Sequence, residues 1–245
     1  IDKDALLVVL PSDHYIKNLA NFRSTLKKAI ACAKDNFLVT IGIKPNAPSI
    51  GYGYIKVNAK KNGYFIVEKF LEKPNLAKAK YYFKNKHFYW NSGMFIWKAS
   101  VLLEEIKKYL PKLYTNLEMI NSVKDIPKAW TRIESISIDY GIMEHSKRIA
   151  LIPSDFYWTD LGSWDALSEV FPKDKKGNII CADAINLNSE GICVFSRGNR
   201  LISTIGLKNV VIVDTADALL VCKKEKSQEV KTLVEILKKK RKKYV

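Results

Sequence analysis

ALLVVLPSDH, residues 5–14, decides the fold class, because six apolar residues run without alternation and stop at a Pro-Ser-Asp turn. A run of this kind is typical of a strand that is buried on both faces, as in a parallel sheet. A helical pattern, with apolar residues three and four apart, follows over residues 22–33, and a second apolar run, FLVTIGI, occupies residues 37–43. Strand, helix and strand within about 40 residues make a βαβ unit and predict an α/β fold.

The rest of the chain divides into a larger and a smaller part. Alternating stretches at 54–58 and 64–70 flank an Asn-Gly turn signal and predict a hairpin. We expect a mixed sheet with helices on both faces, forming a catalytic domain over residues 1–172. After a charged linker, short β segments and an amphipathic helix predict a small β appendage with a terminal helix over residues 173–245.

Composition limits the function classes. Of the 245 residues, 47% are hydrophobic, which is enough for a folded core. The net charge of +16 resides largely in helix-face lysines and a basic block at 238–243, without the aromatic-basic ladder of a single-strand binder, so we expect no specific nucleic-acid partner. No apolar run approaches the roughly 20 residues of a membrane span, and no signal peptide opens the chain, so we expect a cytoplasmic protein. The four cysteines form no CxxC pair and predict reduced thiols.

Two aspartates follow predicted strands and precede predicted helices. Asp13 ends the first strand, and Asp160 lies in YWTDLGSW, just before Ser163, the expected N-cap of the next helix. Ligands of open α/β sheets bind at this edge, and Mg²⁺ is typically held by one or two carboxylates together with substrate phosphates. Each aspartate alone could equally be a turn or cap residue, but together Asp13 and Asp160 are the candidate metal ligands.

Between the two aspartates lie residue types that suit a sugar phosphate. Glycines let the backbone approach a ligand closely, a carboxylate accepts hydrogen bonds from hydroxyl groups, and an ammonium group suits a phosphate. A carboxamide offers a donor and an acceptor together. The candidate substrate-binding residues are therefore Gly51, Tyr52, Gly53, Glu72, Lys73 and Asn91.

Six strings occur in a fixed order along the chain: LPSDHYI, IGYGYI, FLEKP, WNSGMFIW, SIDYGIME and WTDLGSWDAL. Together they resemble the mannose-1-phosphate guanylyltransferases (GDP-mannose pyrophosphorylases), a branch of the sugar nucleotidyltransferases. The resemblance covers nearly the whole chain. It implies a Rossmann-like, GT-A-like nucleotidyltransferase fold and transfer of GMP from GTP to mannose 1-phosphate, which gives GDP-mannose and pyrophosphate.

The resemblance also implies roles for the candidate residues. It gives a catalytic set of Asp13, Lys73 and Asp160, with Mg²⁺ as cofactor and with GTP and mannose 1-phosphate as substrates. Glu72 and Asn91 would bind sugar hydroxyls, Lys73 the sugar phosphate, and the glycine loop would contact the sugar through its backbone.

The sequence departs from the family at its front. The family's Gly-rich signature and its Lys-Pro-Lys-x-Phe element do not occur, nor does GxGxxG or GxxxxGK[ST]. We therefore expect a missing nucleotide segment of roughly 60 to 100 residues, and a first strand that lacks neighbours. Two alternatives follow: a non-catalytic sugar-phosphate-binding relative, or a fragment of a bifunctional guanylyltransferase and mannose-6-phosphate isomerase. The three histidines form no metal-ligand cluster that would support an isomerase, and homo-oligomerisation is left open.

Overall fold

The computed structural model describes residues 2, 4–162, 166–167, 170–241 and 243. Residues 1–12 and 16–158 form one compact unit, and residues 13–15 and 159–245 form a second. The boundary expected between residues 172 and 173 stays a prediction. Across the described ranges, no helix combines the length and the apolar character needed to cross a bilayer.

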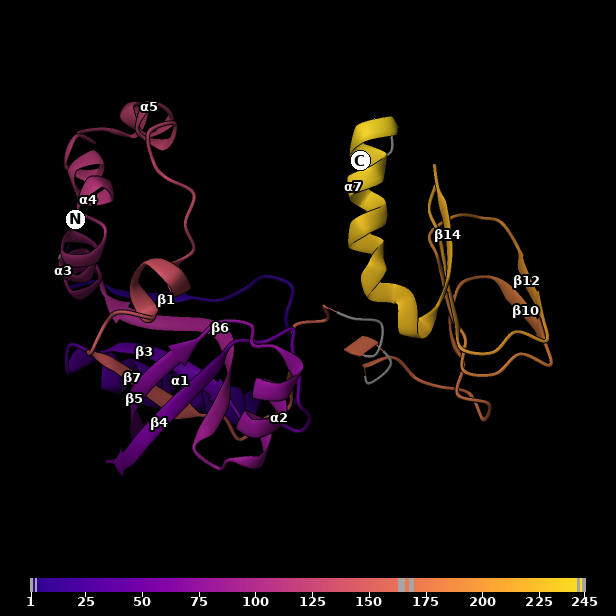
Figure 1. Ribbon diagram of the computed structural model, residues 1–245, viewed down its shortest axis with the longest axis horizontal. Helices are drawn as coiled ribbons and strands as arrows, with labels where there is room; N and C mark the ends of the chain where they lie inside the picture. Colours follow the sequence, from indigo (N-terminus) through magenta and orange to yellow (C-terminus); the bar gives the residue numbers. More distant parts are fainter. Residues whose placement is uncertain (1, 3, 163–165, 168–169, 242, 244–245) are drawn as a thin grey trace. The chain divides into compact units, whose positions relative to one another are not determined.

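A mixed six-stranded sheet lies at the centre of the first unit (Figure 1). Its order is β1-β6-β3-β7-β5-β4, with β3 parallel to β7 and with β4 also paired to β6. The mixed α/β sheet predicted from the sequence is thereby confirmed. The strands are β1 (Leu6–Val9), β3 (Leu38–Ile43), β4 (Tyr54–Lys61), β5 (Tyr64–Leu71), β6 (Phe88–Lys98) and β7 (Ile149–Pro153).

Strand β1 differs from the buried parallel strand that the sequence predicts. It pairs antiparallel with β6 and, within the described part of the chain, has no second neighbour, so it is a sheet edge. Leu7, Val8 and Val9 each keep 39–45% of their surface exposed. Because β6 lies between β1 and β3, the strands of the expected βαβ unit are parallel but not adjacent. The sequence predicts a first strand without neighbours, and β1 has a neighbour, β6, on one side only among the described residues.

Helices cover both faces of the sheet, as predicted. Helices α1 (Leu19–Lys34) and α2 (Leu76–Lys84) pack on the face to which Ile41 of β3 points. Helix α3 (Ala99–Tyr109) packs on the opposite face, where Leu38 of β3 is buried. The alternation of a strand thus divides the apolar side chains of β3 between two cores.

Shorter elements complete the chain up to residue 159. The β4–β5 hairpin turns at Asn62 and Gly63, whose φ angles of 47° and 89° suit these two residue types. Strands β2 and β8 form a small separate pair. The remaining elements up to residue 159 are β2 (Tyr15–Ile16), α4 (Pro111–Glu118), η1 (Val123–Asp125), α5 (Ile126–Trp130), the π-helix η2 (Asp139–Met143) and β8 (Trp158–Thr159).

The second unit contains a four-stranded sheet in which β9, β11 and β13 run parallel and β14 pairs antiparallel with β13. Cys193 lies opposite Ile179 on one side and opposite Val211 on the other, and these three buried side chains form one core. A second parallel pair joins β10 to β12. The elements are β9 (Ile179–Cys181), β10 (Ala184–Leu187), β11 (Cys193–Ser196), β12 (Ile202–Ile205), β13 (Val210–Asp214), β14 (Leu219–Lys223), η3 (Lys224–Glu229) and α7 (Val230–Lys240).

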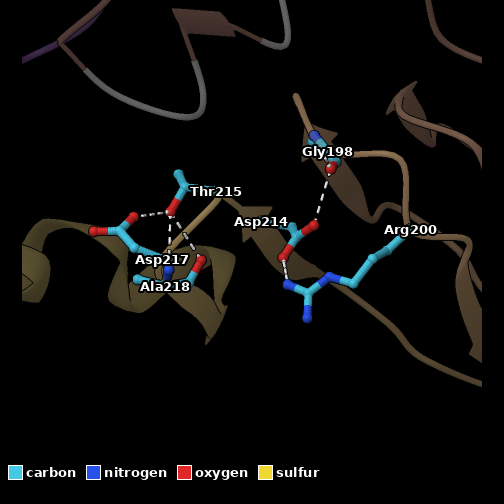
Figure 2. Close-up of polar contacts among 7 residues, drawn as sticks. Gly198, Arg200, Asp214, Thr215, Asp217 and Ala218 are labelled. Carbon is cyan, nitrogen blue, oxygen red and sulfur yellow. Dashed lines mark hydrogen bonds and ion pairs between the residues drawn. The ribbon is translucent and has the colours of Figure 1, made fainter.

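A buried carboxylate stabilises the end of β13. The side chain of Asp214 is 2% exposed and pairs with the guanidinium of Arg200 (Figure 2). The hydrogen bond from Arg200 lowers the pKa of Asp214. Its stabilising effect is therefore present above the ordinary carboxyl pKa and is lost as the pH falls through the lowered value. Beside it, Thr215 Oγ1 donates to Asp217 Oδ1 at 2.9 Å and contacts the carbonyl oxygen of Ala218 at 3.0 Å, closing the turn into β14.

The exposed edge of β1 generates a prediction about self-association. An apolar edge strand with unpaired backbone groups is a template for pairing with another chain. We expect Val9→Lys to weaken self-association about tenfold, or about 1.4 kcal/mol, without lowering the melting temperature. Sedimentation over a concentration series measures this. Val123→Lys, which alters a valine that is 81% exposed on η1, is the matched control, and equal weakening by both variants would contradict a role for β1.

Candidate functional site

A bulge in β6 sets the position of Asn91. Thr40 of β3 pairs with Phe95, but Gly42 pairs with Asn91, so β6 carries two more residues than β3 between these pairs. Gly93 within the bulge has a φ of 68°, a value that glycine adopts without steric cost. Ser92 Oγ donates to the carbonyl oxygen of Ile41 at 2.6 Å and ties the bulge to β3. The WNSGMF string is therefore a bulged strand, a device that commonly aims a side chain beside a functional site.

Gly53, just before β4, and Glu72, just after β5, come together with Asn91 of β6. The backbone N–H of Asn91 donates to the carbonyl oxygen of Gly53 at 2.9 Å. A Cβ atom on Gly53 would lie 2.6 Å from Glu72 Oε2 and 3.5 Å from Asn91 Cβ. Only glycine leaves room for the Glu72 carboxylate at this point. Three residues that the sequence separates are thus neighbours.

The Glu-Lys-Pro segment follows β5 with an unusual backbone. Lys73 has a φ of 30°, although it carries a side chain and precedes Pro74. Such strained conformations persist where the surroundings impose them, and they concentrate at functional sites. Lys73 Nζ lies 3.6 Å from Glu72 Oε1, and the side chain of Lys73 is 64% exposed while that of Glu72 is 11% exposed. Both residues line a cleft of about 610 Å³ that Glu144 and His145 also border.

Two acidic residues at this site were not singled out from the sequence. Asp139 and Glu144 lie at the start and just after the end of η2, in the string SIDYGIME. Asp139 Oδ1 accepts a hydrogen bond from Asn91 Nδ2 at 3.0 Å, and Glu144 Oε1 accepts one from the backbone N–H of Glu72 at 3.4 Å. The η2 segment is a π-helix, whose wider turn brings residues five apart onto one side. The sequence offered one signal for this pair, namely the five-residue spacing between Asp139 and Glu144.

The carboxylates of this site perturb one another. Burial raises the pKa of Glu72, and the charge of Asp139 adds to this rise while Lys73 opposes it. Burial also raises the pKa of Asp139, against the lowering effect of its hydrogen bond from Asn91. Because both acids hold protons more tightly in the folded chain, the fold gains stability as the pH falls through the raised values and is less stable above them. The ionised cluster thus costs stability at neutral pH.

The other two glycine-loop residues have separate surroundings. The ring of Tyr52 packs at 4.8 Å from that of Trp90 and at 5.2 Å from that of Trp158, measured between centroids. The backbone N–H of Gly51 donates to Ser49 Oγ at 3.1 Å, and a Cβ there would meet only that oxygen, at 3.6 Å. Close approach therefore distinguishes Gly53 from Gly51, and the ligand-binding roles of Gly51 and Tyr52 stay predictions.

The second unit contains both candidate metal ligands. Burial lowers the pKa of His14, and the charges of Asp13 and Asp160 oppose this, so both carboxylates act on one imidazole. Asp160 Oδ1 also accepts a hydrogen bond from the N–H of Gly162 at 2.9 Å. Among the described residues, no group of three or more His, Cys, Asp or Glu side chains could hold a metal ion. Ser163, the expected helix N-cap, lies outside the described residues.

Comparison with known proteins identifies the family. The profile described as "Nucleotidyl transferase" matches residues 1–177. The chain belongs to the nucleotidyl transferase family. A second profile, "MannoseP isomerase/GMP-like beta-helix domain", matches residues 182–237, where the parallel strands of the second unit stack.

Curated relatives match along almost all of the chain. The xanthan biosynthesis protein XanB of Xanthomonas campestris pv. campestris (strain B100) is 42% identical over 243 residues, which cover 96% of this chain and 51% of the relative. A putative mannose-1-phosphate guanylyltransferase of Vibrio cholerae serotype O1 is 38% identical and covers 97% of this chain and 53% of the relative. The chain spans about half the length of the curated relatives it matches.

Solved structures share the fold of this chain. The structure titled mannose-1-phosphate geranyltransferase, from Thermus thermophilus, has a TM-score of 0.87 at 30% identity, over 95% of this chain and 70% of that chain. The structure titled mannose-6-phosphate isomerase, from Helicobacter pylori, has a TM-score of 0.57 at 35% identity, over 65% of each chain. These likenesses confirm the predicted nucleotidyltransferase fold.

The contact between Gly53 and Glu72 generates a second prediction. We expect Gly53→Ala to displace the Glu72 carboxylate and to destabilise the fold by about 1–3 kcal/mol through overpacking. Thermal melts measure this change. Gly51→Ala, where a Cβ meets only Ser49 Oγ, should leave the melting temperature unchanged. Equal melting temperatures for both variants would contradict the close packing at Gly53.

Proposed function

We propose that the chain acts in GDP-mannose synthesis, transferring GMP from GTP to mannose 1-phosphate. The observation that carries the proposal is the convergence of Gly53, Glu72, Lys73 and Asn91, from the start of β4, the end of β5 and within β6. Carboxylate and carboxamide groups suit sugar hydroxyls, and an exposed ammonium beside them suits a phosphate. Relatives named mannose-1-phosphate guanylyltransferase, from Klebsiella pneumoniae and Escherichia coli, support the choice of substrates.

The residues of the first unit bind and orient the sugar phosphate. Glu72 accepts hydrogen bonds from sugar hydroxyls, and the backbone at Gly53 admits the sugar against β4. Lys73 neutralises the charge of the phosphate, and its strained backbone conformation fixes the point after β5 from which its side chain extends. Catalysis by such a site consists mainly of positioning and charge neutralisation.

The residues of the second unit fit a magnesium ion. Asp13 and Asp160 supply carboxylate oxygens, the hard ligands that Mg²⁺ takes, and both act on the same imidazole of His14. Asp160 would hold the ion through the carboxylate that Gly162 N–H orients. When bound, Mg²⁺ neutralises charge on the phosphates.

The reaction is a phosphoryl-group substitution. An oxygen of the sugar phosphate forms a bond to the α-phosphorus of GTP, while the bond from that phosphorus to the oxygen bridging to the β-phosphate breaks, and pyrophosphate leaves. Because both substrates are anionic intermediates of cell metabolism, we place the reaction in the cytoplasm.

The test uses the purified chain with Mg²⁺, GTP and mannose 1-phosphate. We expect the chain to bind mannose 1-phosphate in the calorimeter. Release of pyrophosphate that depends on all three components is expected where the chain is joined to a nucleotide segment of the family, whose motifs do not occur in this sequence. Asp160→Asn should raise the Mg²⁺ concentration required. Binding without release would leave a sugar-phosphate-binding protein and overturn catalysis by this chain, whereas failure to bind mannose 1-phosphate would overturn the proposed substrate.

Lys73 generates a separate prediction. Removing a charge-assisted contact to phosphate costs about 1.5–3 kcal/mol, so Lys73→Ala should weaken mannose 1-phosphate binding roughly 10- to 150-fold. Affinity for mannose itself, which carries no phosphate, should change little. Lys80→Ala removes the same charge from the exposed side of α2 and is the matched control. Equal losses for mannose and its phosphate would contradict the phosphate role.

A further inference from the structure

The strongest unassigned feature of the sugar site is the partner of Asn91. Asn91 Nδ2 donates to Asp139 Oδ1 at 3.0 Å, and Asn91 Oδ1 accepts from the backbone N–H of Gly93 at 3.0 Å. The amide is therefore held at both ends, by an acceptor on η2 and by a donor in the β6 bulge. Asn91 and Asp139 are each partly exposed, so a ligand can reach them.

These two contacts fix which way the amide points. A backbone N–H can only donate and an ionised carboxylate can only accept. Rotating the amide by half a turn would place Nδ2 against the N–H of Gly93 and Oδ1 against the Asp139 carboxylate, and both contacts would be repulsive. Of the two Nδ2 hydrogens, Asp139 takes one and leaves the other for a ligand.

We infer that Asp139 is a positioning residue that makes Asn91 a hydrogen-bond donor to the sugar. The inference rests on the proposed function and refines it. A hydroxyl oxygen of the sugar accepts from Asn91 Nδ2, while another hydroxyl of the sugar donates to the Glu72 carboxylate. The site would then select sugar 1-phosphates by the placement of two hydroxyls with opposite hydrogen-bonding roles.

The electrostatic surroundings of Asp139 bear on this role. Burial raises its pKa, the hydrogen bond from Asn91 and the charge of Lys73 lower it, and the charge of Glu144 raises it. Glu72 also interacts with Asp139 through its charge. Protonated Asp139 is a weaker acceptor and can itself donate, so the amide of Asn91 loses its fixed direction. Sugar affinity should therefore fall as the pH falls through the raised pKa of Asp139.

A double-mutant cycle tests the inference by calorimetric titration with mannose 1-phosphate. We expect Asn91→Ala and Asp139→Ala each to weaken binding about 10- to 100-fold, the range for losing a hydrogen bond that involves a charged group. Because Asp139 acts through Asn91, adding Asp139→Ala to Asn91→Ala should weaken binding by no more than about threefold. Glu134→Gln removes an exposed negative charge a few residues away and should leave the affinity unchanged.

The conservative variant separates positioning from folding. In Asp139→Asn the side chain is neutral and, like protonated Asp139, is a weaker acceptor that can itself donate, so its affinity should resemble that of the wild type at low pH and should depend less on pH on the acid side. Unchanged binding by Asp139→Ala, or losses that multiply in the double variant, would overturn the inference while leaving the proposed substrate intact. A wild-type chain that does not bind mannose 1-phosphate would overturn the proposed function itself.

Discussion

The bulge of β6 is the constraint on which the candidate sugar site depends. β6 pairs with β1, β3 and β4, so its path is fixed from both sides. The two residues that it carries in excess over β3 are absorbed between Asn91 and Phe95. With regular pairing, Gly42 would lie opposite Gly93 instead of Asn91, and Asn91 would be shifted by two positions relative to β3. One local irregularity in a regular sheet therefore brings an amide, a glycine backbone and a carboxylate together.

The arrangement of charged groups in the candidate site lowers the stability of the fold. Burial raises the pKa of Glu72 and of Asp139, the charge of Asp139 adds to the rise at Glu72, and the charge of Glu144 adds to the rise at both. Lys73 offsets these charges only from an exposed position and from a strained backbone conformation. Burying like charges and holding a left-handed lysine both cost free energy that an apolar cluster would not. The lost stability has a benefit for binding. The acceptor groups are already in position before the ligand binds, so a sugar hydroxyl meets groups that need no rearrangement.

Local sequence patterns predicted most of the helices and strands, but they did not predict which strands pair over long distances in the sequence. The apolar runs placed β1 and β3, and the Asn-Gly turn placed the β4–β5 hairpin, because these signals act over a few residues. The insertion of β6 between β1 and β3 depends on pairing between residues more than fifty positions apart, which local patterns do not reveal. The apolar run of β1, predicted to be buried, is therefore an exposed edge strand. Likewise, residue chemistry pointed to Glu72 and Asn91 as candidates. Residue chemistry did not show that Gly53 lies beside both Glu72 and Asn91, because this placement depends on the register of three strands.

The missed pair, Asp139 and Glu144, shows how helix type decides which residues cooperate. In an α-helix, residues five apart are rotated by about 140° from each other, so two such acids would point to different sides. In η2 the backbone N–H of Glu144 donates to the carbonyl oxygen of Asp139 at 2.9 Å, five residues back, which is the π-type hydrogen bond. The wider turn lets Asp139 contact Asn91 of β6 while Glu144 contacts the backbone of Glu72 beyond β5. A single π-turn therefore links the two strands that carry the sugar-binding candidates, and restoring α-helical spacing there would separate the two carboxylates from their partners.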